Sequence, residues 1–201
     1  MTEATLASHF PDVESLKKHG TIGKISVGHS AKIIDPEGNE LPPFEKGEMC
    51  MKGPTIMKGY LNREDATREA LNDGWLRTGD IGYYDEDGDF FIVDRIKELI
   101  KVKGLQVPPA ELEDLLLTHP SIKDAAVIGI PDSASGELPK AFVVASGNLT
   151  EKDVQTFVEQ KVSHYKRLKG GVEFVREIPK SASGKILRRV LKDMCQNTVK
   201  A

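Results

Sequence analysis

A loop of small residues that ends in a lysine is the segment best suited to chemistry. Residues 179–186 read PKSASGKI and precede an expected helix. Glycine and serine let backbone N–H groups approach the oxygens of a phosphate, and Lys185 adds a mobile positive charge. The loop is not a Walker P-loop, because that motif requires glycine at 179 and Ser or Thr at 186. Two interpretations stay open, a phosphate-contacting loop and a helix-entry loop with a solvated lysine.

Two further side chains are suited to a nucleotide. Asp80 follows Thr78 and Gly79, and an exposed carboxylate on a glycine turn can accept two hydrogen bonds from a ribose diol. Arg95 offers a rigid fork of donors for phosphate or ribose oxygens. Each has a structural alternative, an ordinary turn for Asp80 and a surface ion pair for Arg95.

A pair of lysines precedes a second glycine turn. Lys101 and Lys103 lie two residues apart, a spacing that places both on one face of a strand, and Gly104 follows them directly. Two ammonium groups on one strand face can bind an anion, although a solvated strand edge is the alternative interpretation.

The residues that must position these groups fall into two parts. The first part, residues 20–93, is rich in expected strands and holds one helix, which Asn62 is expected to cap. A hairpin turn is expected at residues 85–88, which read DEDG. The expected strands are 24–34, 48–51, 81–84 and 90–93, and the expected helix is 63–71.

The second part follows a short charged segment at residues 94–97. Strands and helices interleave there, which predicts a small α+β domain. A helix opens at Pro108-Pro109, and Thr150 is expected to cap another. The expected strands are 98–102, 125–130, 141–145 and 172–175, and the expected helices are 109–119, 151–162 and 186–194.

The composition excludes several classes of protein. The formal net charge is −3, from 28 basic and 31 acidic side chains, which argues against non-specific nucleic-acid binding. Cys50 and Cys195 form no CxxC pair, so we expect reduced thiols rather than a disulfide framework or a zinc site. No run of 18 apolar residues, no signal peptide and no SKL-type terminus is visible, which favours a cytoplasmic protein without a transmembrane segment.

Three ordered motifs carry a resemblance to a known family. They are KGYLNREDAT at 58–67, GWLRTGDIGYYDEDGDFFIVDRIKELIKVKGLQVPPAELE at 74–113 and PKSASGKILRR at 179–189. Together they resemble the adenylate-forming, AMP-binding superfamily of acyl-CoA synthetases, 4-coumarate–CoA ligases and insect luciferases. Met1-Thr2-Glu3 also resembles the end of that family's G-Y-x-T-E motif. Members of the family are often peroxisomal.

The resemblance implies a role for several residues on the nucleotide side. Asp80 matches the acid that holds the ATP ribose hydroxyls, and Arg95 matches an arginine that also contacts the ribose. Thr2 matches a phosphate contact, and Glu3 matches an acid associated with magnesium.

The resemblance also implies roles for residues of the second part. Lys185 matches the lysine that bridges the substrate carboxylate and the α-phosphate. Lys97 matches the hinge on which the small domain rotates. Gln106 matches a glutamine that contacts the adenylate, while Lys101 and Gly104 match the face that forms the thioester.

The family suggests how the chain is divided. Residues 1–93 are expected to be the end of the large AMP-binding domain, a distorted barrel-like β-rich subdomain. Residues 94–97 are the expected hinge, 98–195 the small mobile carboxy-terminal domain and 196–201 a tail. The family's large amino-terminal domain, with its phosphate loop and acyl pocket, is expected to precede residue 1.

The implied activity is that of an acid–thiol ligase. It uses ATP and Mg²⁺ to convert a carboxylic acid into an acyl-adenylate and then transfers the acyl group to coenzyme A. One alternative is a luciferase-like or carrier-protein adenylating enzyme. Another is a non-catalytic truncated fragment or a regulatory product that binds a partner.

Overall fold

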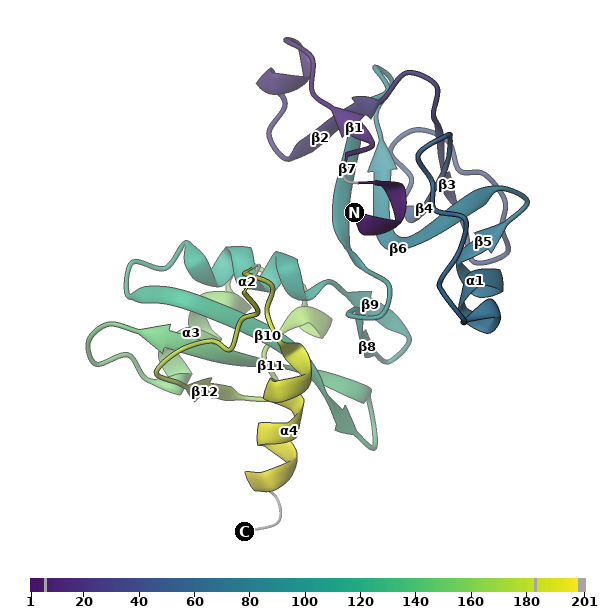
Figure 1. Cartoon of the computed structure of the whole chain (residues 1–201). Coiled ribbons are helices and arrows are strands. Elements are labelled where there is room, and N and C mark those ends of the chain that lie inside the picture. The colour runs from purple at the N-terminus through teal and green to yellow at the C-terminus, as the bar shows by residue number, and fades with distance from the viewer. Residues whose placement is uncertain (6, 183, 199–201) are drawn as a thin grey trace. The chain divides into compact units, whose positions relative to one another are not determined.

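The computed structural model describes residues 1–5, 7–182 and 184–198. The chain divides into two compact units, Met1–Lys97 and Glu98–Ala201. Each unit combines an antiparallel or mixed sheet with short helices (Figure 1), so the predicted α+β class is confirmed. Within the described part of the chain, no helix combines the length and apolar character that a membrane crossing requires.

Unit 1 is built on a seven-stranded antiparallel sheet with the order β1-β2-β7-β6-β4-β3, and β5 pairs with β6. The strand β6 is irregular at its glycines, since Gly79 has a left-handed φ of 71° and the pairing with β7 shifts register between Ile81 and Gly82. The strands are β1 (His9–Phe10), β2 (Thr21–Ile25), β3 (Ser30–Ile34), β4 (Gly47–Lys52), β5 (Leu71–Asn72), β6 (Trp75–Tyr84) and β7 (Phe90–Arg95), with the helices η1 (Thr2–Ala4), η2 (Ser15–Lys17) and α1 (Glu64–Ala70).

The core of unit 1 forms where strands from distant parts of the sequence meet. Met49 and Met51 lie two residues apart in β4, so they point to the same face of the sheet. They pack there with Ile33, Leu76 and Phe90, all buried. This small apolar cluster fixes β6 and β7, the two strands that carry Asp80 and Arg95.

A lysine and three carboxylates hold the turn between β6 and β7. The Lys18 ammonium lies 2.5 Å from Asp85, 2.7 Å from Asp87 and 2.7 Å from Asp89. These hydrogen bonds, that of Asp85 first, raise the pKa of Lys18 above its ordinary range. Ser15 also donates to Asp89, so the turn is tied to η2. The carboxylates would repel one another without this cation.

Unit 2 has a five-stranded sheet with the order β10-β11-β8-β9, and β12 runs parallel to β11. The strands are β8 (Ile100–Val102), β9 (Leu105–Val107), β10 (Ile122–Asp132), β11 (Gly136–Ala145) and β12 (Val172–Phe174), with the helices α2 (Pro109–Leu117), α3 (Glu151–Glu159), η3 (His164–Lys166) and α4 (Arg188–Thr198).

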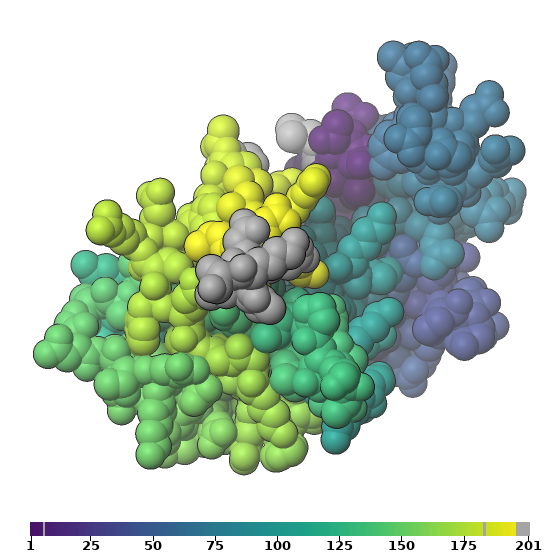
Figure 2. Space-filling view, turned by 90° about the horizontal axis from the view of Figure 1, so that it is seen from below, coloured from purple at the N-terminus to yellow at the C-terminus, as the bar shows by residue number. Residues whose placement is uncertain are grey.

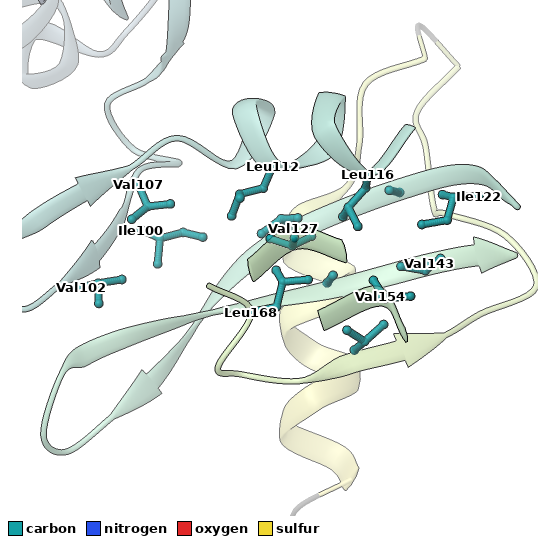
Figure 3. Close-up of a cluster of buried hydrophobic side chains, with 14 residues drawn as sticks. Ile100, Val102, Val107, Leu112, Leu116, Ile122, Val127, Val143, Val154 and Leu168 are labelled. Atoms are coloured by element: carbon teal, nitrogen blue, oxygen red, sulfur yellow. The ribbon is translucent and has the colours of Figure 1, made fainter. Parts of the chain in front are cut away.

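Alternation along β10 gives unit 2 an apolar cluster on each face of its sheet. Val127 joins a cluster with Leu112 and Leu116 of α2 and Val154 of α3 (Figure 3). Its neighbour Ile128 points the other way, into a cluster that α4 and the loop before it complete. Figure 2 shows residues of α4, in yellow, at the surface of unit 2. The sheet is therefore a shared base for α2, α3 and the loop of Lys185.

Several elements differ from the sequence prediction in unit 1. Asn62 does not cap α1, because Arg63 is the capping residue and Asn62 instead turns the chain with φ 55°. The predicted strand 24–34 is two strands, β2 and β3, because the chain reverses at Gly28 with φ 81°.

In unit 2, the predicted cap at Thr150 is confirmed by a reciprocal capping box with Asp153.

The two ends of unit 2 also differ from the prediction. The strand predicted at 98–102 is only Ile100–Val102, and β9 was not predicted. The last helix starts at Arg188, two residues later than predicted, and runs to Thr198. The segment 196–201 predicted as a tail therefore begins with the end of a helix, and residues 199–201 lie outside the described residues.

We expect Lys18→Met to lower the melting temperature of this chain clearly, because it leaves three clustered carboxylates without their shared cation. Lys17→Met is the matched control, since Lys17 pairs with Glu14 and both side chains are mostly exposed. Thermal unfolding of the two variants by circular dichroism tests this. Equal melting temperatures would contradict the assigned role of Lys18.

Candidate functional site

Asp80 and Arg95 face each other across two neighbouring strands. They are direct partners in the register of β6 and β7, and Arg95 Nε lies 3.1 Å from Asp80 Oδ1. The Asp80 side chain is 17% exposed, whereas that of Arg95 is 54% exposed. The ion pair therefore leaves the arginine fork accessible at the edge of a largely covered carboxylate.

The turn that precedes Asp80 is fixed by hydrogen bonds on both sides. Thr78 Oγ1 donates to the Met49 carbonyl at 2.8 Å and accepts the Asp80 N–H at 3.0 Å. Gly79 takes a left-handed φ of 71°, and its carbonyl accepts the Ile96 N–H at 2.9 Å. Glycine permits this conformation without a Cβ penalty. The Thr-Gly-Asp segment is thus a rigid support for the carboxylate.

Opposing effects set the protonation of Asp80. Burial raises the pKa of Asp80 above its ordinary value, and the Arg95 charge and hydrogen bond partly offset this. The negative charge of Glu3 adds to the rise. Glu3 is therefore close enough to Asp80 to act on it, although 77 positions separate them in the sequence.

Thr2 and Glu3 lie in η1, at the start of the chain. Glu3 Oε1 accepts the Tyr60 hydroxyl at 3.0 Å, and the Glu3 carbonyl accepts the Met57 N–H at 2.8 Å. The Thr2 side chain is exposed. Unit 1 thus brings Glu3, Asp80 and Arg95 into one neighbourhood from three separate segments.

Lys101 and Gln106 lie opposite each other in the hairpin of β8 and β9. They are direct cross-strand partners, so their exposed side chains share one face. Lys103 and Gly104 form the two-residue turn, with φ of 50° and 80°. Gly104 was predicted as a turn, and the structure adds that the position before it is left-handed too.

Lys185 lies on the tight loop that joins β12 to α4. Within the loop, Ser181 N–H donates to the Lys185 carbonyl at 2.8 Å, and Gly184 N–H donates to the Ser181 carbonyl at 2.9 Å. Lys180 anchors one end through an ion pair of 2.6 Å with Asp124. Ser183 lies outside the described residues. The Lys185 ammonium has no ion-pair partner among the described residues, so it is available to an anion.

An ion-pair network centred on Arg188 fixes the other end of the lysine loop. Arg188, the first residue of α4, lies 3.0 Å from Glu98 and 3.1 Å from Glu113. Glu113 also accepts the Val127 N–H of β10 at 2.7 Å. The Arg188 and Glu113 side chains are 15% and 11% exposed, whereas that of Glu98 is 36% exposed, so the Arg188–Glu113 pair is the part that is largely removed from water. Arg188, Glu98 and Glu113 are not among the site residues predicted from the sequence.

The segment predicted as a hinge is only partly exposed. Asp94 and Arg95 belong to β7, and Asp94 is buried, so the expected hinge at 94–97 is not a linker exposed along its whole length. The strand continues to Arg95 because Asp80 pairs with it. Ile96 and Lys97 are exposed and form a turn, and Lys97 is the last residue of unit 1.

Two family profiles match the chain in the order expected. The AMP-binding enzyme family matches residues 1–61, and the AMP-binding enzyme C-terminal domain matches residues 111–185. This chain belongs to the AMP-binding enzymes. The resemblance stated from the motifs is thereby confirmed.

Curated relatives of this AMP-binding enzyme chain include ligases and a luciferase. Peroxisomal OPC-8:0-CoA ligase 1 of Arabidopsis thaliana is 52% identical over 196 residues, which cover 95% of this chain and 36% of that protein. Luciferin 4-monooxygenase of Nipponoluciola cruciata is 53% identical over 186 residues, or 90% of this chain and 34% of that protein. The chain therefore spans about a third of the length of the curated relatives it matches.

Solved structures of AMP-binding enzymes share this fold. The o-succinylbenzoate CoA synthetase of Bacillus subtilis, in complex with its acyl-adenylate intermediate, has a TM-score of 0.88 at 35% identity. The match covers 96% of this chain and 40% of that structure. The same enzyme in complex with ATP and magnesium ion has a TM-score of 0.86.

We expect Arg95→Met to raise the pKa of Asp80 further, because the variant removes the charge and hydrogen bond that favour the carboxylate while burial remains. A pH titration of the Asp80 carboxyl carbon by NMR on this chain measures the effect. Arg63→Met is the control, since Arg63 pairs with the exposed Asp65 instead. An unchanged or lowered pKa of Asp80 in Arg95→Met would show that the pair does not control this carboxylate.

Proposed function

We propose that this chain supplies the carboxy-terminal part of an acid–thiol ligase, which activates a carboxylic acid with ATP and transfers the acyl group to coenzyme A. The observation that carries the proposal is the pair of exposed lysines, Lys101 and Lys185, on two separately fixed loops of one compact unit. Lys185 suits the formation of the acyl-adenylate, and Lys101 suits the formation of the thioester. The CoA ligases among the relatives support the same activity.

In the first half-reaction the substrate carboxylate attacks the α-phosphate of ATP, and pyrophosphate leaves. Lys185 is proposed to lie between the carboxylate and the α-phosphate, where its point charge offsets the growing negative charge of the transition state. Asp80 and Arg95 are proposed to bind the ribose, since the carboxylate accepts and the guanidinium donates. Gln106 is proposed to contact the adenylate, and Thr2 a phosphate.

In the second half-reaction the thiol of coenzyme A attacks the acyl carbonyl, and AMP leaves. Lys101 and Gly104 are proposed to form the face that serves this step. Since they lie on a different loop from Lys185, unit 2 would turn about Lys97 between the two half-reactions.

A magnesium ion fits the residues proposed for the triphosphate side. Glu3 offers a carboxylate oxygen, and Mg²⁺ is typically held by one or two carboxylates together with substrate phosphates and waters. When bound, the ion neutralises triphosphate charge. Glu3 is already oriented by the Tyr60 hydroxyl, which leaves its second oxygen for the metal.

One relative favours a second candidate function. Because a luciferin 4-monooxygenase is 53% identical to this chain, the acyl-adenylate could react with oxygen instead of coenzyme A. Product analysis with each acceptor supplied separately to the complete enzyme distinguishes the two. A non-catalytic role, through binding to a partner, would give no adenylate with either acceptor.

Limited trypsin digestion of this chain should cut first after Lys97. Ile96 and Lys97 are exposed in the turn at 96–98, whereas Arg95 is held in β7 by its pairing with Asp80. The expected products match the two units, residues 1–97 and 98–201. Early cleavage between residues 110 and 165, with the 97–98 bond intact, would argue against a hinge at Lys97.

Substitutions of Lys101 and Lys185 should slow different half-reactions of the complete enzyme. The complete enzyme means this chain together with the amino-terminal region that its relatives carry. Lys185→Ala should slow acyl-adenylate formation by about 10²–10³-fold, because it removes one electrostatic contact of the transition state. The same variant should largely spare thioester formation from synthetic acyl-adenylate. Lys101→Ala should have the reverse pattern.

Pyrophosphate release measures the first half-reaction, and thioester formation from synthetic acyl-adenylate and coenzyme A measures the second. Lys192→Ala, at an exposed position of α4, is the control and should change neither rate. If Lys101→Ala and Lys185→Ala slow the same half-reaction equally, the two lysines share one static site and unit 2 does not alternate.

A further inference from the structure

We propose that Glu137 is a positioning residue for Lys101, and thus for the thioester-forming half-reaction. The proposal rests on the proposed function of Lys101. Glu137 lies in β11, 36 positions away from Lys101 in the sequence, and its carboxylate acts on the backbone of the β8–β9 hairpin rather than on a substrate.

The β8–β9 hairpin needs an external support because its turn is unfavourable for one of its residues. Lys103 has a φ of 50°, a left-handed conformation that costs free energy for a residue with a Cβ. Gly104 adopts the next left-handed position, with φ 80°, without that cost. Such conformations persist where the surrounding structure holds them, and they concentrate at functional sites.

Glu137 supplies the first support. Its Oε2 accepts the backbone N–H of Lys101 at 2.8 Å. A hydrogen bond to a charged acceptor is stronger than one between neutral groups. The bond fixes the backbone from which the Lys101 side chain projects, while the ammonium itself has no ion-pair partner among the described residues.

The loop between β10 and β11 supplies a second support beside the first. The Ser135 carbonyl accepts the N–H of Lys103 at 2.7 Å, and Gly136 pairs with Val102. Asp132 in turn fixes that loop, since its Oδ1 accepts the Ser135 N–H at 2.7 Å. The β10–β11 hairpin therefore holds three consecutive residues of the β8–β9 hairpin, namely Lys101, Val102 and Lys103.

The absence of a side chain at Gly129 makes room for the Glu137 carboxylate. A Cβ at position 129 would lie 2.9–3.1 Å from the three atoms of that carboxylate group. Gly129 has no left-handed φ, so alanine fits its backbone conformation. Gly129→Ala should therefore displace the carboxylate without removing its charge, which offers an independent way to break the contact.

The first test measures the contact itself, by amide hydrogen exchange of this 201-residue chain followed by NMR. Glu137→Ala and Gly129→Ala should both speed exchange at the Lys101 amide, and Glu137→Gln should have a smaller effect because its carbonyl can still accept. Glu151→Ala is the matched control, since Glu151 accepts the Val172 N–H at 3.0 Å elsewhere in unit 2. It should speed exchange at Val172 and not at Lys101.

The second test measures the two half-reactions in the complete enzyme. Glu137→Ala should slow thioester formation from synthetic acyl-adenylate roughly 10- to 100-fold, as expected when a reacting group is misplaced by about 1 Å. Adenylate formation should stay within about twofold, because the Lys185 loop has its own supports. Glu137→Gln should recover part of the rate, Gly129→Ala should resemble Glu137→Ala, and Glu151→Ala should spare thioester formation.

The outcomes separate the proposal from a merely structural role. A loss of both half-reactions in parallel would make Glu137 a general stability residue, and an unchanged thioester rate with a freely exchanging Lys101 amide would also overturn the proposal. If the wild-type complete enzyme forms no acyl-adenylate, the proposed function fails. The exchange result then still decides whether Glu137 holds Lys101.

Discussion

The interaction on which unit 2 most depends is the network of Arg188 with Glu98 and Glu113. It joins the start of the unit, the helix α2, the strand β10 and the loop that ends at Lys185. Breaking a buried ion pair by removing one partner costs about 3–5 kcal/mol, because the other charge is left without compensation. The network thus makes the Lys185 loop move with the rest of unit 2, so that a rotation near Lys97 would carry the whole loop.

In unit 1, Asp80, the carboxylate proposed to bind the ribose, is held in an unfavourable environment. Burial raises the pKa of Asp80, and the charge and hydrogen bond of Arg95 offset only part of the cost. That cost is tolerated because the core around Met51 and Leu76 and the tied turn at Lys18 hold β6 and β7 in place. A carboxylate already removed from water interacts more strongly with a polar ligand than a fully solvated one does.

Local patterns predicted much of this fold, and long-range contacts account for the rest. The turn at 85–88 and the cap at Thr150 depend on neighbouring residues, so they were predicted correctly. The Arg188 network was missed because its members lie far apart in sequence, although Glu113 carried a signal. It lies between Leu112 and Leu116 on the apolar stripe of α2, where a carboxylate requires a partner. No local pattern could have selected Glu137, whose partner depends on the pairing of two hairpins.

The choice between lysine and arginine follows from what each position must do. Arg95 and Arg188 join carboxylates on separate elements, and a planar fork loses less freedom for each bond it forms. Lys101 and Lys185 keep their ammonium groups unpaired within the described residues, and a flexible stem lets a point charge follow a ligand through a reaction. Lys18, unlike these two lysines, is paired, and lysine suits its position because the three donors of an ammonium group can bond to three carboxylates at once. The paired charges of this chain therefore hold its elements together, and the two lysines proposed to act in the half-reactions have ammonium groups with no ion-pair partner among the described residues.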